Sequence, residues 1–115
     1  MTLDQFYRAV GGTAAEAAPR LGGADATRRF LRLFPLDDSF PRLSEALGRG
    51  DVQTAFRAAH TLKGVAANLG LEQLRALASD MTECLRRGEL SGAQARLAET
   101  ETAYRRVLAA LEELE

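Results

Sequence analysis

The sequence predicts an all-α protein, an up-down antiparallel four-helix bundle with additional N-terminal helices that cap one end. Alanine and leucine together supply 39 of the 115 residues, and the β-branched apolar residues that favour strands are almost absent. Apolar residues recur three and four positions apart in most segments, as they do on one face of a helix. Glycine and proline separate these segments, and the short connections favour antiparallel packing of consecutive helices.

Residues 1–36 are expected to form accessory helices that cover one end of the bundle. Thr2 is suited to cap the first helix and Asp25 the third, because their side-chain oxygens accept from free backbone N–H groups. The second segment is alanine-rich, although Pro19 is unusual inside a helix. The predicted accessory helices cover residues 2–10, 13–21 and 25–34.

Residues 37–115 are expected to form the bundle itself, and residues 1–115 a single domain. Gly48 is expected to end the first bundle helix, and Ser91 with Gln94 to form a capping box at the start of the last. The second of these helices has the cleanest apolar seam, with successive steps of three and four residues. The predicted bundle helices cover residues 40–47, 52–69, 71–87 and 91–114.

Charge, cysteine content and hydropathy exclude several classes of protein. The 15 cationic and 16 anionic side chains nearly balance, so no basic excess exists to neutralise the phosphates of a nucleic acid. Cys84 is the only cysteine, which excludes an internal disulfide and a multi-cysteine zinc site. No stretch approaches the ~18 consecutive apolar residues of a membrane span. We therefore expect a cytoplasmic protein that binds neither nucleic acid nor membrane.

The only histidine, His60, and the only lysine, Lys63, lie three positions apart in the helix predicted over 52–69. A rotation of 100° per residue places His60 about 130° from the centre of the apolar stripe, so its ring faces solvent. Gly64 follows one turn later, although glycine inside a helix costs about 1 kcal/mol relative to alanine. A bare backbone there allows a large partner to approach, and the Lys63 ammonium suits an anion such as a phosphoryl group. A solvated histidine without any role is the simpler alternative.

Residues 60–70 read HTLKGVAANLG. This segment resembles the signature of histidine-containing phosphotransfer (HPt) domains, which is His-x-Leu-Lys-Gly followed by small residues and a hydrophobic residue with glycine. The resemblance is strong over residues 51–87. It implies a four-helix bundle whose exposed histidine carries a phosphoryl group between receiver-domain aspartates of response regulators. It further implies that His60 is the phosphoacceptor, that Lys63 steadies the phosphoryl oxygens and that Gly64 makes room for the partner.

The sequence departs from the family pattern at two positions. Val65 stands where many members carry a small hydroxyl residue, and Thr82 stands where several carry a glutamine that orients the imidazole. Arg86, one turn beyond Thr82, is expected to take over some of that role. The helix geometry and the resemblance together define the expected partner-binding surface, which consists of Phe56, Arg57, Ala67, Asn68, Thr82 and Arg86.

The resulting hypothesis is a phosphorelay intermediate that accepts and donates a phosphoryl group on His60. The chain has no glycine-rich phosphate loop, so we expect neither an ATP site nor autokinase activity. A lone histidine without other ligands predicts no metal site, and Mg²⁺ is expected on the partner receiver domain. Response-regulator receivers and a hybrid sensor histidine kinase are the expected partners. A non-catalytic helical bundle for protein interaction or dimerisation stays open as the alternative.

Overall fold

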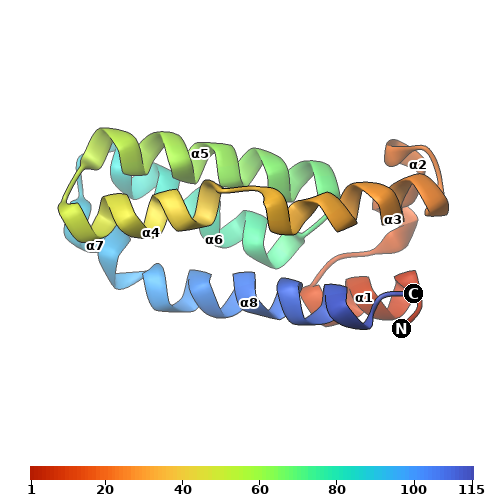
Figure 1. The fold of residues 1–115 in the computed structure, drawn as a ribbon. Coiled ribbons are helices and arrows are strands. Elements are labelled where there is room, and N and C mark those ends of the chain that lie inside the picture. Colours follow the sequence, from red (N-terminus) through yellow and green to blue (C-terminus); the bar gives the residue numbers. More distant parts are fainter.

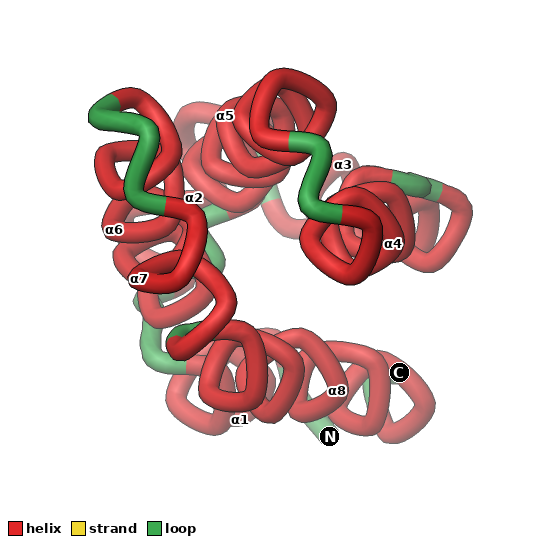
Figure 2. Tube along the Cα trace, turned by 90° about the vertical axis from the view of Figure 1, so that its left-hand side faces the viewer, coloured by secondary structure: helices red, strands yellow, loops and turns green.

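The computed structural model describes all 115 residues and contains no strand. Four of its helices form a bundle around a common core. These helices are α4 (Ser39–Arg49), α5 (Val52–Leu69), α6 (Glu72–Arg86) and α8 (Leu97–Glu113). In an end-on view α5 lies between α4 and α6, and α8 lies opposite α5 (Figure 2). Consecutive helices run antiparallel (Figure 1). The predicted all-α bundle is confirmed.

The N-terminal helices gather at one end of this bundle, as predicted (Figure 1). The helix α1 packs along the C-terminal part of α8, and α3 leads through the short 3₁₀ helix η1 into α4. The amino group of Met1 donates to the carbonyl of Glu113 at 2.7 Å, which joins the two ends of the chain. The bounds of these elements are α1 (Leu3–Val10), α2 (Ala14–Leu21), α3 (Ala24–Leu33) and η1 (Phe34–Leu36).

The C-terminal end of α5 is braced by α1 and the loop that follows it. The buried Tyr7 hydroxyl donates to the carbonyl of Leu69 at 2.7 Å. Burial raises the pKa of Tyr7 to about 12, against a smaller opposing effect of the Arg20 charge. Gly70 ends α5 with a φ of 72°, and a Cβ added at Gly12 would lie only 2.2 Å from the Gly70 carbonyl oxygen. The loop after α1 is therefore packed against the end of α5 without room for a side chain at Gly12.

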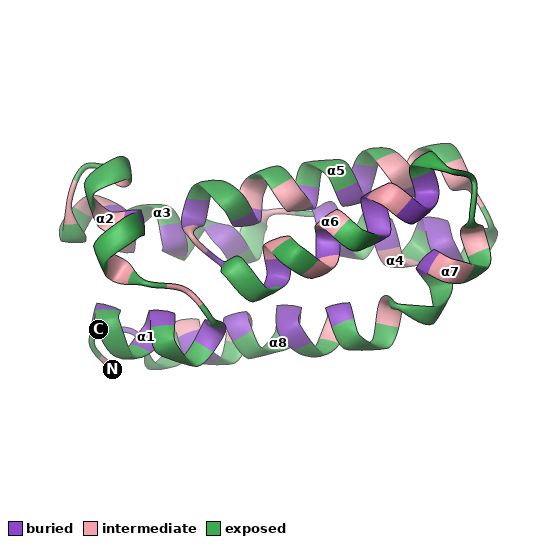
Figure 3. Ribbon diagram, turned by 180° about the vertical axis from the view of Figure 1, so that it is seen from behind, coloured by how far each residue is buried: buried purple, intermediate pink, exposed green.

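One cluster of 29 buried apolar residues runs through the bundle from Leu3 to Leu114, and Figure 3 shows how this buried face follows each helix. The predicted seam of α5 is buried apart from Val52, which is half-buried. Thr100, a polar residue on the buried face of α8, is also buried, and its hydroxyl donates to the Arg96 carbonyl at 2.9 Å. Because this hydroxyl has a partner, Thr100 leaves no unsatisfied group in the core.

The last bundle helix differs from the prediction, because it is broken into α7 (Leu90–Ala95) and α8. The capping box predicted for Ser91 and Gln94 is wrong. The Gln94 side chain instead donates to the carbonyl of Leu47 at 2.8 Å. This bond ties α7 to the last turn of α4 and leaves α8 to begin afresh at Leu97.

Two further predicted helix ends are wrong. The helix α3 begins at Ala24 after Gly23, so Asp25 lies in the first turn instead of capping it. The helix α4 continues through Gly48 and ends at Gly50, which adopts a φ of 72°. Only Gly50 provides the left-handed conformation that this helix end requires. No helix combines the length and hydropathy that crossing a membrane demands.

Candidate functional site

The helix α5 presents His60 near its middle, on the side that faces away from the bundle. At its N-terminus, the Asp51 side chain accepts from the Thr54 backbone N–H at 3.1 Å. The hydrogen bonds from Thr54 hold the pKa of Asp51 below its usual value, so the cap is ionised at neutral pH. Ala59 and Leu62, the buried neighbours of His60, fix the rotation of the helix. His60 is therefore exposed, in agreement with the helical geometry.

Gly64 lies on the same exposed ridge, one turn beyond His60. A Cβ added at Gly64 would meet no atom within 4 Å, and the backbone there has no positive φ. Neither packing nor backbone conformation therefore requires glycine at this position. Ala67 and Asn68 continue the exposed ridge toward the end of α5. The surface of α5 next to the imidazole, at Gly64, is therefore open to solvent.

Two cationic side chains, Arg57 and Lys63, lie three residues before and three residues after His60 on α5. Lys63 is half-buried and Arg57 is exposed, and neither makes an ion pair. The helix α5 contains no aspartate or glutamate. No three His, Cys, Asp or Glu side chains gather anywhere as potential metal ligands. The ridge therefore offers positive charge to an incoming anion.

An aromatic contact links His60 to α6. The rings of Phe56 and His60 are nearly parallel, at 16°, with their centroids 6.1 Å apart. The Arg86 guanidinium carbon lies 5.0 Å from the centroid of the Phe56 ring, a distance typical of a cation–π contact. Arg86 also pairs with Glu83 at 3.5 Å. Of the residues expected on α6, Arg86 thus reaches the neighbourhood of the imidazole through Phe56.

Thr82 does not belong to this surface, and its predicted place there is wrong. The residue is fully buried, and its hydroxyl donates to the Ala78 carbonyl at 2.7 Å. It lies on the face of α6 that packs into the core together with Met81 and Leu85. Its hydroxyl is therefore committed to its own helix.

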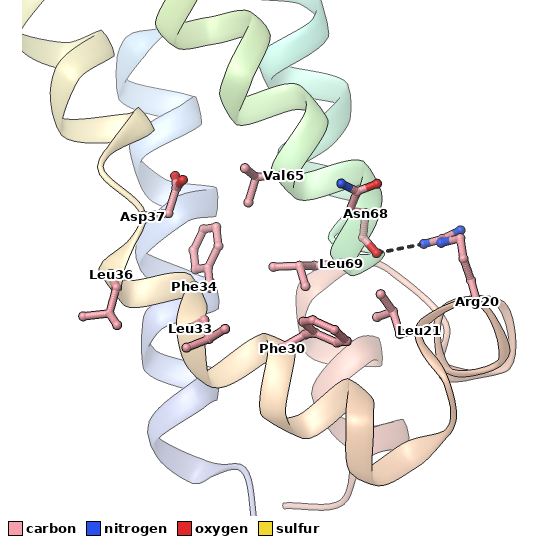
Figure 4. Close-up of a pocket in the computed structure, with 10 residues that line it drawn as sticks. All are labelled: Arg20, Leu21, Phe30, Leu33, Phe34, Leu36, Asp37, Val65, Asn68 and Leu69. Atoms are coloured by element: carbon pink, nitrogen blue, oxygen red, sulfur yellow. Dashed lines mark hydrogen bonds between the residues drawn. The ribbon is translucent and has the colours of Figure 1, made fainter.

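The structure adds a feature that sequence reasoning missed, an apolar groove of about 630 Å³ between α3, η1 and the end of α5 (Figure 4). It contains the three large apolar side chains that are exposed in this protein, Phe30 at 46%, Leu33 at 56% and Leu36 at 80%. We call it the α3–α5 groove. Its lining residues are Arg20, Leu21, Phe30, Leu33, Phe34, Leu36, Asp37, Val65, Asn68 and Leu69.

A signal for this groove exists in the sequence. Four of the five residues from Phe30 to Phe34 are apolar, which is more than one face of a helix can bury. Only Leu31 and Phe34 enter the core. The other two apolar residues of this run therefore had to face either solvent or a partner.

Comparison with protein-family models gives a match to the Hpt domain over residues 36–115. This match covers η1 in part and all of α4 to α8, whereas α1, α2 and α3 lie outside it. No curated protein and no solved structure matches the chain. Hpt domains take part in phosphotransfer in two-component systems, in which they interact with receiver domains and kinases. On this match, which spans more than half of its length, the chain belongs to the Hpt domain family.

Proposed function

We propose that this protein carries a phosphoryl group on His60 and exchanges it with the aspartates of receiver domains in a phosphorelay. The observation that carries the proposal is the open ridge at Gly64. Glycine there costs about 1 kcal/mol of helix stability relative to alanine, although nothing in the fold occupies the space of a Cβ. The bare backbone is explained if a partner of domain size must come close to the neighbouring imidazole.

The transfer is a nucleophilic substitution at phosphorus. One ring nitrogen of the neutral His60 imidazole attacks with its lone pair, in line with the bond to the aspartyl oxygen, while the other nitrogen keeps its proton. A nitrogen–phosphorus bond forms and the phosphorus–oxygen bond of the acyl phosphate breaks. The electron pair of that bond returns to the receiver aspartate as a carboxylate. The reverse sequence passes the group on to a second receiver.

Charge on the ridge supports this chemistry. The transferred group carries negative charge that is spread over its oxygens, and the unpaired Lys63 ammonium offsets part of it. The carboxylates that hold Mg²⁺ would come from the receiver, because α5 has no acidic residue beside His60. The chain itself would serve as carrier, without an ATP site.

The docking face for the receiver would surround His60. Arg57, Ala67 and Asn68 are exposed on α5, and Arg86 joins them from α6 over the ring of Phe56. A receiver domain within a hybrid sensor kinase presents the same chemistry as a separate response regulator. Because receivers and their kinases act in the cytoplasm, the proposal places this protein there as well.

The test is transfer from a receiver domain that has been phosphorylated with acetyl phosphate in the presence of Mg²⁺. We expect the chain to take up an acid-labile and base-stable label, and His60→Gln to abolish it while the helical circular dichroism stays unchanged. His60 is the only histidine, so no second imidazole can carry the label. Lys63→Gln is the matched control for a label on the lysine, and it should slow transfer without abolishing it. Uptake of the full label by His60→Gln would refute the assignment.

The same variant separates the proposal from a pure docking module. A protein that only docks would bind a receiver and never become labelled, and its signalling output in cells would survive His60→Gln. The proposal requires the opposite, which is that receiver binding persists while both label and output are lost.

A further inference from the structure

We propose that Phe56 is a positioning residue for the phosphoacceptor. Its ring stacks on the His60 imidazole and holds the imidazole in one orientation, so that a docked receiver always meets the same ring nitrogen. The inference rests on the proposed function and deepens it, because it concerns how the imidazole is presented and leaves the transfer reaction unchanged.

The exposure of His60 creates the need for such a residue. Its imidazole faces solvent, and an exposed side chain passes between its staggered rotamers within nanoseconds. In-line attack on phosphorus requires the reacting nitrogen to point at the partner, and a small misplacement of the reacting atoms slows a reaction strongly. A group that restricts the rotation of the ring therefore raises the fraction of docked complexes that can react.

The position of Phe56 on α5 allows it to restrict that rotation. Phe56 precedes His60 by four residues, and side chains at this spacing meet on one face of a helix. The planes of the two rings are 16° from parallel, and their centroids lie 6.1 Å apart. These values are typical of an offset-stacked aromatic pair. The contact therefore favours the one imidazole orientation that lies parallel to the Phe56 ring.

No other side chain fixes the imidazole. His60 makes neither an ion pair nor a side-chain hydrogen bond, and it takes part in no second aromatic pair. One turn further along α5, Gly64 has no side chain that could contact the ring. On α6, the Thr82 hydroxyl is buried and donates to the Ala78 carbonyl. The orientation of the imidazole thus depends on Phe56.

The Phe56 ring is itself held in place by both α5 and α6. It is half-buried and packs against the core, where it lines a hollow together with Val52 and Leu85. The Arg86 guanidinium carbon lies 5.0 Å from the centroid of the ring, and Arg86 is in turn paired with Glu83. Because two helices hold the ring, it offers the imidazole a fixed surface.

The alternative is that Phe56 contacts the receiver directly, as the sequence predicts. The large apolar side chains that the protein exposes are Phe30, Leu33 and Leu36, and Phe56 is not among them. Its ring is already in contact with the core, with Arg86 and with the imidazole. The proposal therefore commits to positioning, and docking becomes an outcome of the test.

The experiment compares the wild-type chain with Phe56→Leu, which keeps an apolar side chain without the ring, and with Phe56→Tyr, which keeps the ring. The matched control is Val52→Ala, at a half-buried position of the same hollow that is not stacked on His60. Transfer from receiver domains labelled with acetyl phosphate is measured as a function of receiver concentration. Direct labelling by phosphoramidate, a small donor that approaches the ring from any direction, is measured in parallel.

A spectroscopic measurement reports the orientation without any partner. The three-bond couplings between the Hα and the two Hβ protons of His60, measured by nuclear magnetic resonance on the full chain, depend on χ1. We expect one large and one small coupling in the wild type and in Phe56→Tyr, as a single helical rotamer gives. In Phe56→Leu the two couplings should become nearly equal, because the ring then exchanges between two χ1 wells.

The same count of rotamers sets the expected loss of transfer. A free imidazole on a helix occupies two χ1 wells with about two χ2 orientations each, so the productive orientation is populated roughly a quarter of the time. We expect Phe56→Leu to lower the rate at saturating receiver about fourfold and to leave the KM for the receiver and the labelling by phosphoramidate unchanged. Phe56→Tyr should restore the rate, and Val52→Ala should behave as the wild type.

Four results would overturn this assignment and leave the proposed function standing. The first is a wild-type rate at saturating receiver in Phe56→Leu. The second is a raised KM at an unchanged saturated rate, which would assign Phe56 to docking. The third is an equal slowing in Val52→Ala, which would assign the effect to packing of the hollow. The fourth is a pair of nearly equal His60 couplings in the wild type, a result that decides even if Phe56→Leu fails to fold.

Failure of the proposed function has a different signature. Absence of transfer from every receiver domain of the same organism to the wild-type chain would overturn the proposed function, and the positioning role of Phe56 with it.

Discussion

Replacement of Gly64 should affect stability and phosphoryl transfer in opposite directions. In Gly64→Ala the new methyl group has no neighbour within 4 Å, so the variant gains the helix propensity of alanine at no steric cost. That gain is about 1 kcal/mol in a helix interior. For a chain of this length it corresponds to a rise in Tm of about 4 °C. The same methyl group stands in the path of a receiver that must reach His60.

The loss of transfer should grow with the size of the side chain. A displacement of the reacting groups by about 1 Å costs on the order of 100-fold in rate. We expect Gly64→Ala to lower kcat/KM for transfer several-fold, and Gly64→Gln to lower it by about 100-fold or more. Thermal unfolding followed by circular dichroism and transfer from a labelled receiver give the two quantities.

Gly48 provides the control, because it also lies inside a helix with open space around its Cβ position. Gly48→Gln on α4 should leave transfer unchanged, with a Tm equal to or above that of the wild type. Direct labelling by phosphoramidate should survive in Gly64→Gln, because a small donor needs little room. Transfer at the wild-type rate from a receiver to Gly64→Gln would refute the explanation of the glycine.

Three further predictions concern the bracing of α5 and the aromatic contact. Tyr7→Phe should lower the free energy of unfolding by about 1–2 kcal/mol at neutral pH, because the buried Leu69 carbonyl loses its donor. In the wild type, burial raises the pKa of Tyr7 from 10 to about 12. The contribution of the protonated hydroxyl to the free energy of unfolding is therefore fully present below pH 10. About 3 kcal/mol is then lost between pH 10 and 12, and urea unfolding of Tyr7→Phe should show a smaller loss over this range. Gly12→Ala should destabilise by about 2 kcal/mol or more, since its Cβ meets a backbone oxygen, and an unchanged Tm would contradict the packing of α1. Arg86→Gln should shift the ring resonances of Phe56 and slow transfer about threefold, a loss that matches the ~0.5–1 kcal/mol of an exposed cation–π contact.

The bounds and the orientation of α5 can be predicted from the sequence, because its local signals all indicate the same helix. Asp51 supplies the N-cap, Gly70 supplies the left-handed end, and the apolar steps of three and four fix which face is buried. The exposure of His60 and Gly64 follows from the same rotation. For these residues the tertiary structure adds little to what periodicity predicts.

Features that depend on contacts between distant segments could not be read in this way. The break after Ala95 has neither glycine nor proline at its centre, and it accompanies the bond from Gln94 to the end of α4. The family resemblance predicts Thr82 near the imidazole, whereas the packing of α6 buries it. The groove joins residues 20–37 to residues 65–69, and no local pattern reports that proximity.

The accessory helices support the end of α5, although they lie outside the family match. The buried face of α5 secures the fold and leaves the exposed face free of structural demands, which is why a costly glycine is tolerated there. The end of that helix is held by Tyr7 and Arg20, which donate to its last carbonyl groups from α1 and α2. The helix α3 follows α2 in the chain and carries Phe30 and Leu33, two of the three large apolar side chains that the protein exposes. A shortened chain of residues 36–115 would therefore lose the support of the α5 end together with the groove. It should therefore unfold at a lower temperature than the full chain, and an equal Tm of the two chains by circular dichroism would contradict this role of Tyr7 and Arg20.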